Sequence, residues 1–126
     1  MELLKRKMEN KDFGKQLEVR TKKFAIDIIK LSSSLNNTSE CRVIKNQITK
    51  SGTSVGANYR EANRSRSKAD FANKIKFCES EASETVYWLE IIEELNWGDP
   101  QKLKLTIIEA NEILALFTSI GKKLKQ

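Results

Sequence analysis

Two glycines four residues apart are the first feature of this sequence that could bind a ligand. Gly52 and Gly56 lie in the segment KSGTSVGAN, just after Lys50. A phosphate-binding loop requires Lys and then Ser or Thr after its last glycine, and a buried strand before the loop. Here Ala57 and Asn58 follow Gly56, and the preceding residues have helical spacing. The pattern therefore favours a small-residue seam inside a helix, where a neighbouring helix can approach closely.

A pair of carboxylates, Glu81 and Glu84, is the second candidate for chemistry. Paired carboxylates can perform acid–base catalysis when one of them is desolvated. The chain has no histidine, which excludes a Ser-His-Asp triad, a Cys-His pair and a histidine-based metal site. We therefore expect Glu81 and Glu84, with Asn58 and Glu61, to form a structural polar network or a subunit contact. We expect no enzymatic activity, no metal and no cofactor.

A basic segment is the third candidate, and it indicates nucleic-acid binding. The candidate contact residues are Arg42, Lys50, Arg60, Arg64, Arg66 and Lys68. Residues 1–76 carry 18 Lys or Arg against 8 Asp or Glu, whereas residues 77–126 carry 5 against 9. Such a cluster would neutralise phosphates in a salt-dependent way without reading the base sequence. A solvated helix end would have the same composition, and no known nucleic-acid readout motif is present.

The elements that position these residues are predicted to be four α-helices, because apolar residues recur with helical spacing in four segments. The helices span residues 12–34, 39–65, 68–96 and 100–123, and residues 1–10 either extend the first helix or fray. The apolar stripe of the first helix consists of Phe13, Leu17, Phe24, Ile28, Leu31 and Leu35. Short joints between long helices favour an all-α, antiparallel up-down-up-down four-helix bundle, with residues 1–126 forming one domain.

Polar residues mark the joints between the helices. Thr38 or Ser39 suits the N-cap of the second helix, and Ser67 suits that of the third. The segment NWGDP ends the third helix with a glycine suited to left-handed backbone, and it starts the fourth with Asp99 and Pro100.

The third helix carries two apolar seams, more than one bundle face requires. The first consists of Phe71, Ile75, Cys78, Ala82, Leu89 and Ile92, and the second of Phe77, Trp88, Ile91 and Leu95. We therefore expect this helix to bury two faces, and we expect the chain to form a homo-oligomer.

The remaining composition limits the compartment. No apolar run is long enough for a transmembrane helix, and the N-terminus lacks the apolar core of a signal peptide. Cys41 and Cys78, the two cysteines, both fall on apolar stripes and are predicted to be buried thiols. We expect a cytoplasmic protein without membrane contact.

The segments SGTSVGANYREANRSRSKADF and ESEASETVYWLEIIEEL closely resemble a family of bacterial four-helix-bundle proteins. These are the ribosomal RNA intervening-sequence proteins, to which the accessory variability proteins of diversity-generating retroelements are related. The resemblance covers residues 15–124 and implies an antiparallel bundle that assembles into a homopentamer. It implies no catalytic residues. The retroelement proteins bind nucleic acid and partner a reverse transcriptase, but they are strongly basic, whereas the second half of this chain is acidic.

Two hypotheses of function follow. The first is a non-enzymatic, oligomeric accessory protein that binds nucleic acid, RNA rather than DNA, through a basic surface. The alternative is a structural adaptor oligomer that binds a protein partner such as a reverse transcriptase.

Overall fold

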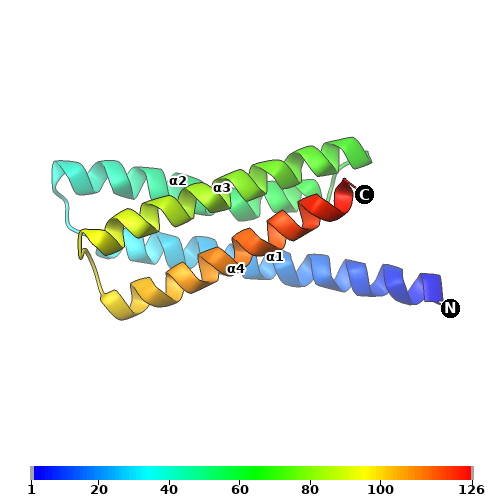
Figure 1. Cartoon of the computed structure of the whole chain (residues 1–126), viewed down its shortest axis with the longest axis horizontal. Helices are drawn as coiled ribbons and strands as arrows, with labels where there is room; N and C mark the ends of the chain where they lie inside the picture. The colour runs from blue at the N-terminus through cyan, green and yellow to red at the C-terminus, as the bar shows by residue number, and fades with distance from the viewer. Residues whose placement is uncertain (1, 126) are drawn as a thin grey trace.

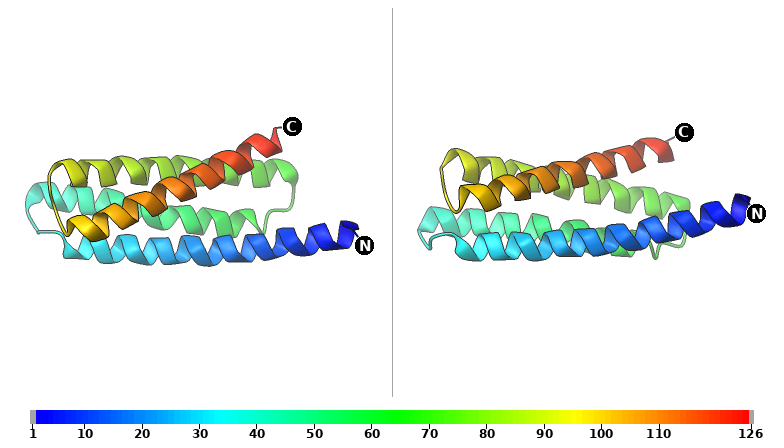
Figure 2. Two further views of the ribbon diagram at one scale, coloured as in Figure 1. Left: turned by 60° about the horizontal axis from the view of Figure 1, so that its bottom comes forward. Right: turned by 90° about the horizontal axis from the view of Figure 1, so that it is seen from below.

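The computed structural model describes the backbone of residues 2–125 and, except for residues 3–9, their side chains. It contains four α-helices: α1 (Glu2–Ser34), α2 (Ser39–Ala62), α3 (Lys68–Glu94) and α4 (Pro100–Leu124). Successive helices run in opposite directions, which confirms the predicted antiparallel bundle (Figure 1). The two chain ends and the α2–α3 joint lie at one end of the bundle, and the other two joints lie at the opposite end (Figure 2).

The predicted caps begin three of the helices. The Thr38 hydroxyl accepts from the backbone N–H of Cys41, and the Ser67 hydroxyl accepts from that of Asp70. The Asp99 carboxylate accepts from the N–H of Gln101 at 2.9 Å, and Pro100 occupies the first turn of α4.

The ends of α2 and α3 fall two to three residues before the predicted positions. After Ala62, the N–H groups of Arg64 and Ser65 bond to carbonyls three residues back, which tightens the chain into a turn. After Glu94, Asn96 adopts a left-handed backbone with φ of 58°, which an α-helix cannot continue. Gly98 is also left-handed, as predicted. At the N-terminal side, α1 begins at Glu2, so residues 2–10 extend the first helix.

The core follows the predicted stripes with two exceptions. Phe24, Ile28, Ile48, Ile75, Leu89, Ile113 and Phe117 are among its fully buried side chains. Phe13 was predicted to be core but is 44% exposed, so the first buried residue of the predicted α1 stripe is Leu17. The prediction that the second seam of α3 is buried is also wrong for the single chain, because Phe77 and Leu95 are each 51% exposed.

The two glycines of α2 lie where α1 crosses it most closely, as the sequence predicted. A methyl group built on Gly52 would lie 2.8 Å from Cγ2 of Ile28. One built on Gly56 would lie 3.2 Å from the backbone carbonyl carbon of Thr21. The glycines are therefore required by packing between helices.

The first and last helices touch over a shorter length than the helices that are adjacent in sequence. The guanidinium of Arg20 on α1 binds two carboxylates of α4. Its Nε lies 2.8 Å from Glu109 Oε2, and its Nη2 lies 2.6 Å from Glu109 Oε1 and 2.7 Å from Glu112 Oε2. The hydrogen bonds from Arg20 lower the pKa of Glu109, so this carboxylate stays ionised.

No helix within residues 2–125 combines the length and the apolar character that a bilayer crossing requires.

Candidate nucleic-acid interface

The α2–α3 joint brings four of the predicted contact residues together at one end of the bundle. Arg60 lies in the last turn of α2, Arg64 and Arg66 lie in the joint, and Lys68 begins α3. All four are exposed. Arg60 Nε lies 3.6 Å from Glu18 Oε1, a weak ion pair, whereas the other three have no ion-pair partner among the described side chains.

The C-terminus of α4 adds three further cations that the sequence analysis missed. Lys122, Lys123 and Lys125 lie at the same end of the bundle as the α2–α3 joint (Figures 1 and 2). The rings of Tyr59 on α2 and Phe117 on α4 meet edge to face at 5.4 Å, which is a contact between the second halves of these two helices. The sequence could have indicated these lysines, because α2 and α4 of an up-down-up-down bundle run in the same direction and therefore end at the same end of the bundle.

We name these seven residues the basic end: Arg60, Arg64, Arg66, Lys68, Lys122, Lys123 and Lys125. Within residues 60–68 and 122–125 there is one carboxylate, that of Glu61. It is already engaged, since it accepts a hydrogen bond from Lys74 Nζ at 2.9 Å. Glu18 of α1 also reaches this end, where it pairs with Arg60. The remaining six cations form no ion pair with the described side chains, so they give this end a positive potential.

Two predicted contact residues lie away from the basic end. Arg42 is in the first turn of α2, 18 residues before Arg60 and so about 27 Å away along the helix axis. Lys50 is in the middle of α2 and acts on Glu81 of α3. Burial and then the charge of Glu84 raise the pKa of Glu81, while Lys50 opposes that rise.

The four residues predicted to form a polar network do not contact one another as a group. Asn58 donates to the backbone carbonyl of Ser54 at 2.9 Å, and Glu84 accepts from Trp88 Nε1 at 3.1 Å. The buried polar contact between α2 and α3 is instead Ser51 with Thr85, whose hydroxyl oxygens are 2.9 Å apart. The sequence pattern missed this pair because small hydroxyl residues are common on any helix face.

Thiols and carboxylates are the groups of the described residues that could bind a metal ion. No group of three or more thiols or carboxylates among them is placed to hold a metal ion. Both cysteines are buried, and burial raises the pKa of Cys78 to about 12, so its thiol is protonated at neutral pH.

The second seam of α3 and the neighbouring Tyr87 form a surface that we name the α3 outer stripe. It consists of Phe77, Tyr87 and Leu95, which are exposed, and of Trp88 and Ile91, which are partly buried. Tyr87 is 57% exposed and its ring meets that of Trp88 edge to face at 5.0 Å. Glu81 and Glu84 border this stripe on the same helix. The single chain therefore leaves three large apolar side chains of this stripe, those of Phe77, Tyr87 and Leu95, exposed.

Comparisons with known proteins match the chain to a family model and to solved structures. A family model described as 23S rRNA-intervening sequence protein matches residues 15–119. A solved structure, a protein with unknown function from the S23 ribosomal protein family of Bacteroides thetaiotaomicron, is 37% identical with a TM-score of 0.77. That alignment covers 83% of this chain and 97% of the other. No curated protein matches the chain.

Proposed function

The chain belongs to the family of 23S rRNA-intervening sequence proteins, and from this premise we propose that it is a non-enzymatic accessory protein that binds RNA in the cytoplasm. The observation that supports the proposal is the basic end, where seven cations from three helices and one joint lie near two carboxylates, Glu61 and Glu18, that are already paired. RNA is favoured over DNA because the family is described by its link to ribosomal RNA.

The chemistry of the basic end favours the phosphate backbone over the bases as the point of contact. Arginine and lysine bind phosphate oxygens and release counterions, which makes the affinity strongly dependent on salt. If five of the seven cations each neutralise one phosphate of a single strand, log K falls with log salt with a slope of about −3.5. Raising the salt from about 50 to about 200 mM then weakens binding about 100-fold.

The test is fluorescence anisotropy with a labelled single-stranded RNA, a hairpin RNA and the corresponding DNA. The variant Arg64→Glu with Arg66→Glu reverses two unpaired cations of the basic end. We expect it to weaken binding at least about tenfold and to make the salt slope shallower by about 1.4. The variant Lys122→Glu with Lys123→Glu should have a similar effect if α4 contributes.

The matched control is Arg42→Glu with Lys104→Glu, which makes the same change in net charge at the opposite end of the bundle. It should retain most of the affinity. An equal loss in this control would mean that overall charge, not the basic end, governs binding. Absence of binding to every nucleic acid at low salt would refute the proposal. In that case, recovery of one protein partner in a nuclease-insensitive pull-down would support the adaptor hypothesis.

We also propose that the chain forms a homo-oligomer through the α3 outer stripe. The support is the exposure of large apolar side chains that a single chain leaves in water. Phe77→Glu with Leu95→Glu should convert the oligomer to a 14.4 kDa monomer in light scattering. Leu105→Glu with Val19→Glu, which changes apolar residues on other helices that are exposed even more, should leave the oligomer intact. A wild-type monomer at micromolar concentration would refute this proposal.

A further inference from the structure

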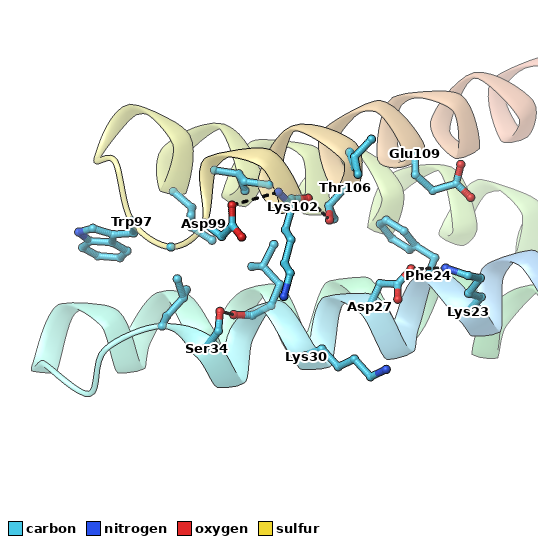
Figure 3. A pocket seen from close by; sticks show the side chains of 16 residues that line it. Lys23, Phe24, Asp27, Lys30, Ser34, Trp97, Asp99, Lys102, Thr106 and Glu109 are labelled. Atoms are coloured by element: carbon cyan, nitrogen blue, oxygen red, sulfur yellow. Dashed lines mark hydrogen bonds and ion pairs between the residues drawn. The ribbon is translucent and has the colours of Figure 1, made fainter.

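A groove of about 510 Å³ runs between the second half of α1 and the first half of α4 (Figure 3). The α3–α4 joint closes one of its ends with Trp97, Gly98 and Asp99. It lies at the end of the bundle opposite the basic end. Its volume falls within the range of small-molecule sites, and such sites commonly lie between the helices of bundles.

The floor of the groove is apolar and comes from three helices and a joint. The residues that supply it are Phe24, Leu31, Leu35, Ile92, Trp97 and Leu103. Leu105, on the rim, is 64% exposed. The groove is bounded on its two long sides by the second half of α1 and the first half of α4.

Among the charged side chains that line the groove, every carboxylate has a partner, whereas two lysines have none among the described residues. Each carboxylate is engaged: Asp27 accepts from Lys23 at 2.8 Å, Glu109 binds the guanidinium of Arg20, and Asp99 caps α4. The remaining two charged groups, Lys30 and Lys102, form no ion pair with the described residues. In Figure 3 the side chain of Lys102 extends from α4 across the gap toward α1.

We propose that this groove binds a small organic anion with an apolar body, such as a medium-chain carboxylate. The alkyl or aromatic body would lie against Phe24, Leu35 and Leu103, and the anionic group would reach Lys102, whose side chain crosses the gap. The side chain of Lys30 points away from the gap in Figure 3 and would add to the positive potential at longer range. A cation would find no unpaired carboxylate among the lining residues, and a fully polar anion would leave the apolar floor uncovered. This inference is independent of RNA binding, because the two sites lie at opposite ends of the bundle.

The first experiment is calorimetry of the full chain with sodium decanoate, decanol and decyltrimethylammonium, which share one chain length and differ in charge. We expect saturable binding of decanoate, weaker binding of decanol and no binding of the cation. In the Trp88→Phe variant, Trp97 is the one tryptophan left, and its fluorescence should change as decanoate binds. Equal binding of decanol and decanoate would overturn the proposed role of the lysines.

Two variants test the site itself. Lys102→Glu replaces an attraction by a repulsion and should weaken decanoate binding about tenfold. Lys104→Glu makes the same charge change two residues away, outside the groove, and should change binding less than about twofold. Thr106→Phe places a ring in the groove and should abolish binding of decanoate.

Two outcomes would contradict the proposal after binding has been detected. Equal effects of Lys102→Glu and Lys104→Glu would place the ligand elsewhere. A change of oligomeric state on Thr106→Phe, with decanoate binding unaltered, would mean that a second copy of the chain covers the groove. Failure of wild-type protein to bind decanoate would overturn the proposal directly.

Discussion

Replacing Gly52 with alanine tests whether the glycines of α2 serve packing or ligand binding. The new methyl group would lie 2.8 Å from Cγ2 and 2.9 Å from Cγ1 of Ile28. Carbon atoms normally pack at about 3.5–4.0 Å. Ile28 is fully buried and, as a β-branched residue in a helix, is held near one rotamer. The two helices must therefore separate to admit the methyl group.

The size of the effect follows from two opposing terms. Overpacking a core by one methyl group costs about 1–3 kcal/mol. Replacing glycine by alanine inside a helix stabilises that helix by about 1 kcal/mol. We therefore expect Gly52→Ala to lower the free energy of unfolding by up to about 2 kcal/mol.

Gly121→Ala is the matched control, because a methyl group there would have no neighbour within 4 Å. It should be neutral or stabilising by up to about 1 kcal/mol. Gly56→Ala should resemble Gly52→Ala, since its methyl group would meet the backbone of Thr21, which cannot rotate away. The difference between Gly52→Ala and Gly121→Ala largely removes the helix-propensity term and should be about 1–3 kcal/mol.

The assay is urea unfolding followed by circular dichroism at one fixed protein concentration, because self-association makes stability depend on concentration. With an m value of about 2 kcal/mol/M, the midpoint of Gly52→Ala should fall by up to about 1 M. A midpoint for Gly52→Ala as high as that of Gly121→Ala would refute the close crossing of α1 and α2.

Three further predictions concern single side chains. Arg20→Lys keeps the charge but loses the two-point contact with Glu109, and should cost about 1 kcal/mol at neutral pH. Because Arg20 lowers the pKa of Glu109, this difference should disappear in urea titrations as the pH falls below about 4. Cys78, whose pKa burial raises to about 12, should resist a thiol reagent at pH 8 until the protein unfolds. Since the folded state favours the protonated thiol, stability should fall from about pH 9 upward, and less so in Cys78→Ala. Asp99→Ala should cost about 1 kcal/mol in thermal unfolding, whereas Asp99→Asn, which retains an acceptor for the N–H of Gln101, should cost much less.

The elements of the fold could be predicted from the sequence because their causes are local. The spacing of apolar residues indicates the buried face of a helix, and one capping residue, such as Ser67 or Asp99, indicates where the helix starts. The glycine pair predicted a close crossing for the same reason, since a small residue four positions from another lies on one side of the helix. The predicted ends of α2 and α3 were late because the left-handed Asn96 and the tight turn after Ala62 have weak sequence signals.

The candidate site could be predicted only in part. The cations of residues 60–68 are neighbours in sequence, so their clustering needed no tertiary information. Arg42 lies on the same helix but far along it, and Lys50 faces the carboxylates of α3, so the sequence pattern grouped them too widely. Whether the α3 outer stripe is buried depends on which other helix or chain covers it. The spacing of apolar residues along one helix does not give this information.

The sequence by itself therefore determined four helices, their caps, their buried faces and the basic segment between α2 and α3. The tertiary structure decided which distant residues share a surface. It joined Lys122, Lys123 and Lys125 to the arginines of residues 60–66, and it left a groove between the second half of α1 and the first half of α4. The physical reason is that capping and periodicity act within a few residues of the chain. The angle and spacing between two helices instead result from side chains contributed by segments far apart in sequence.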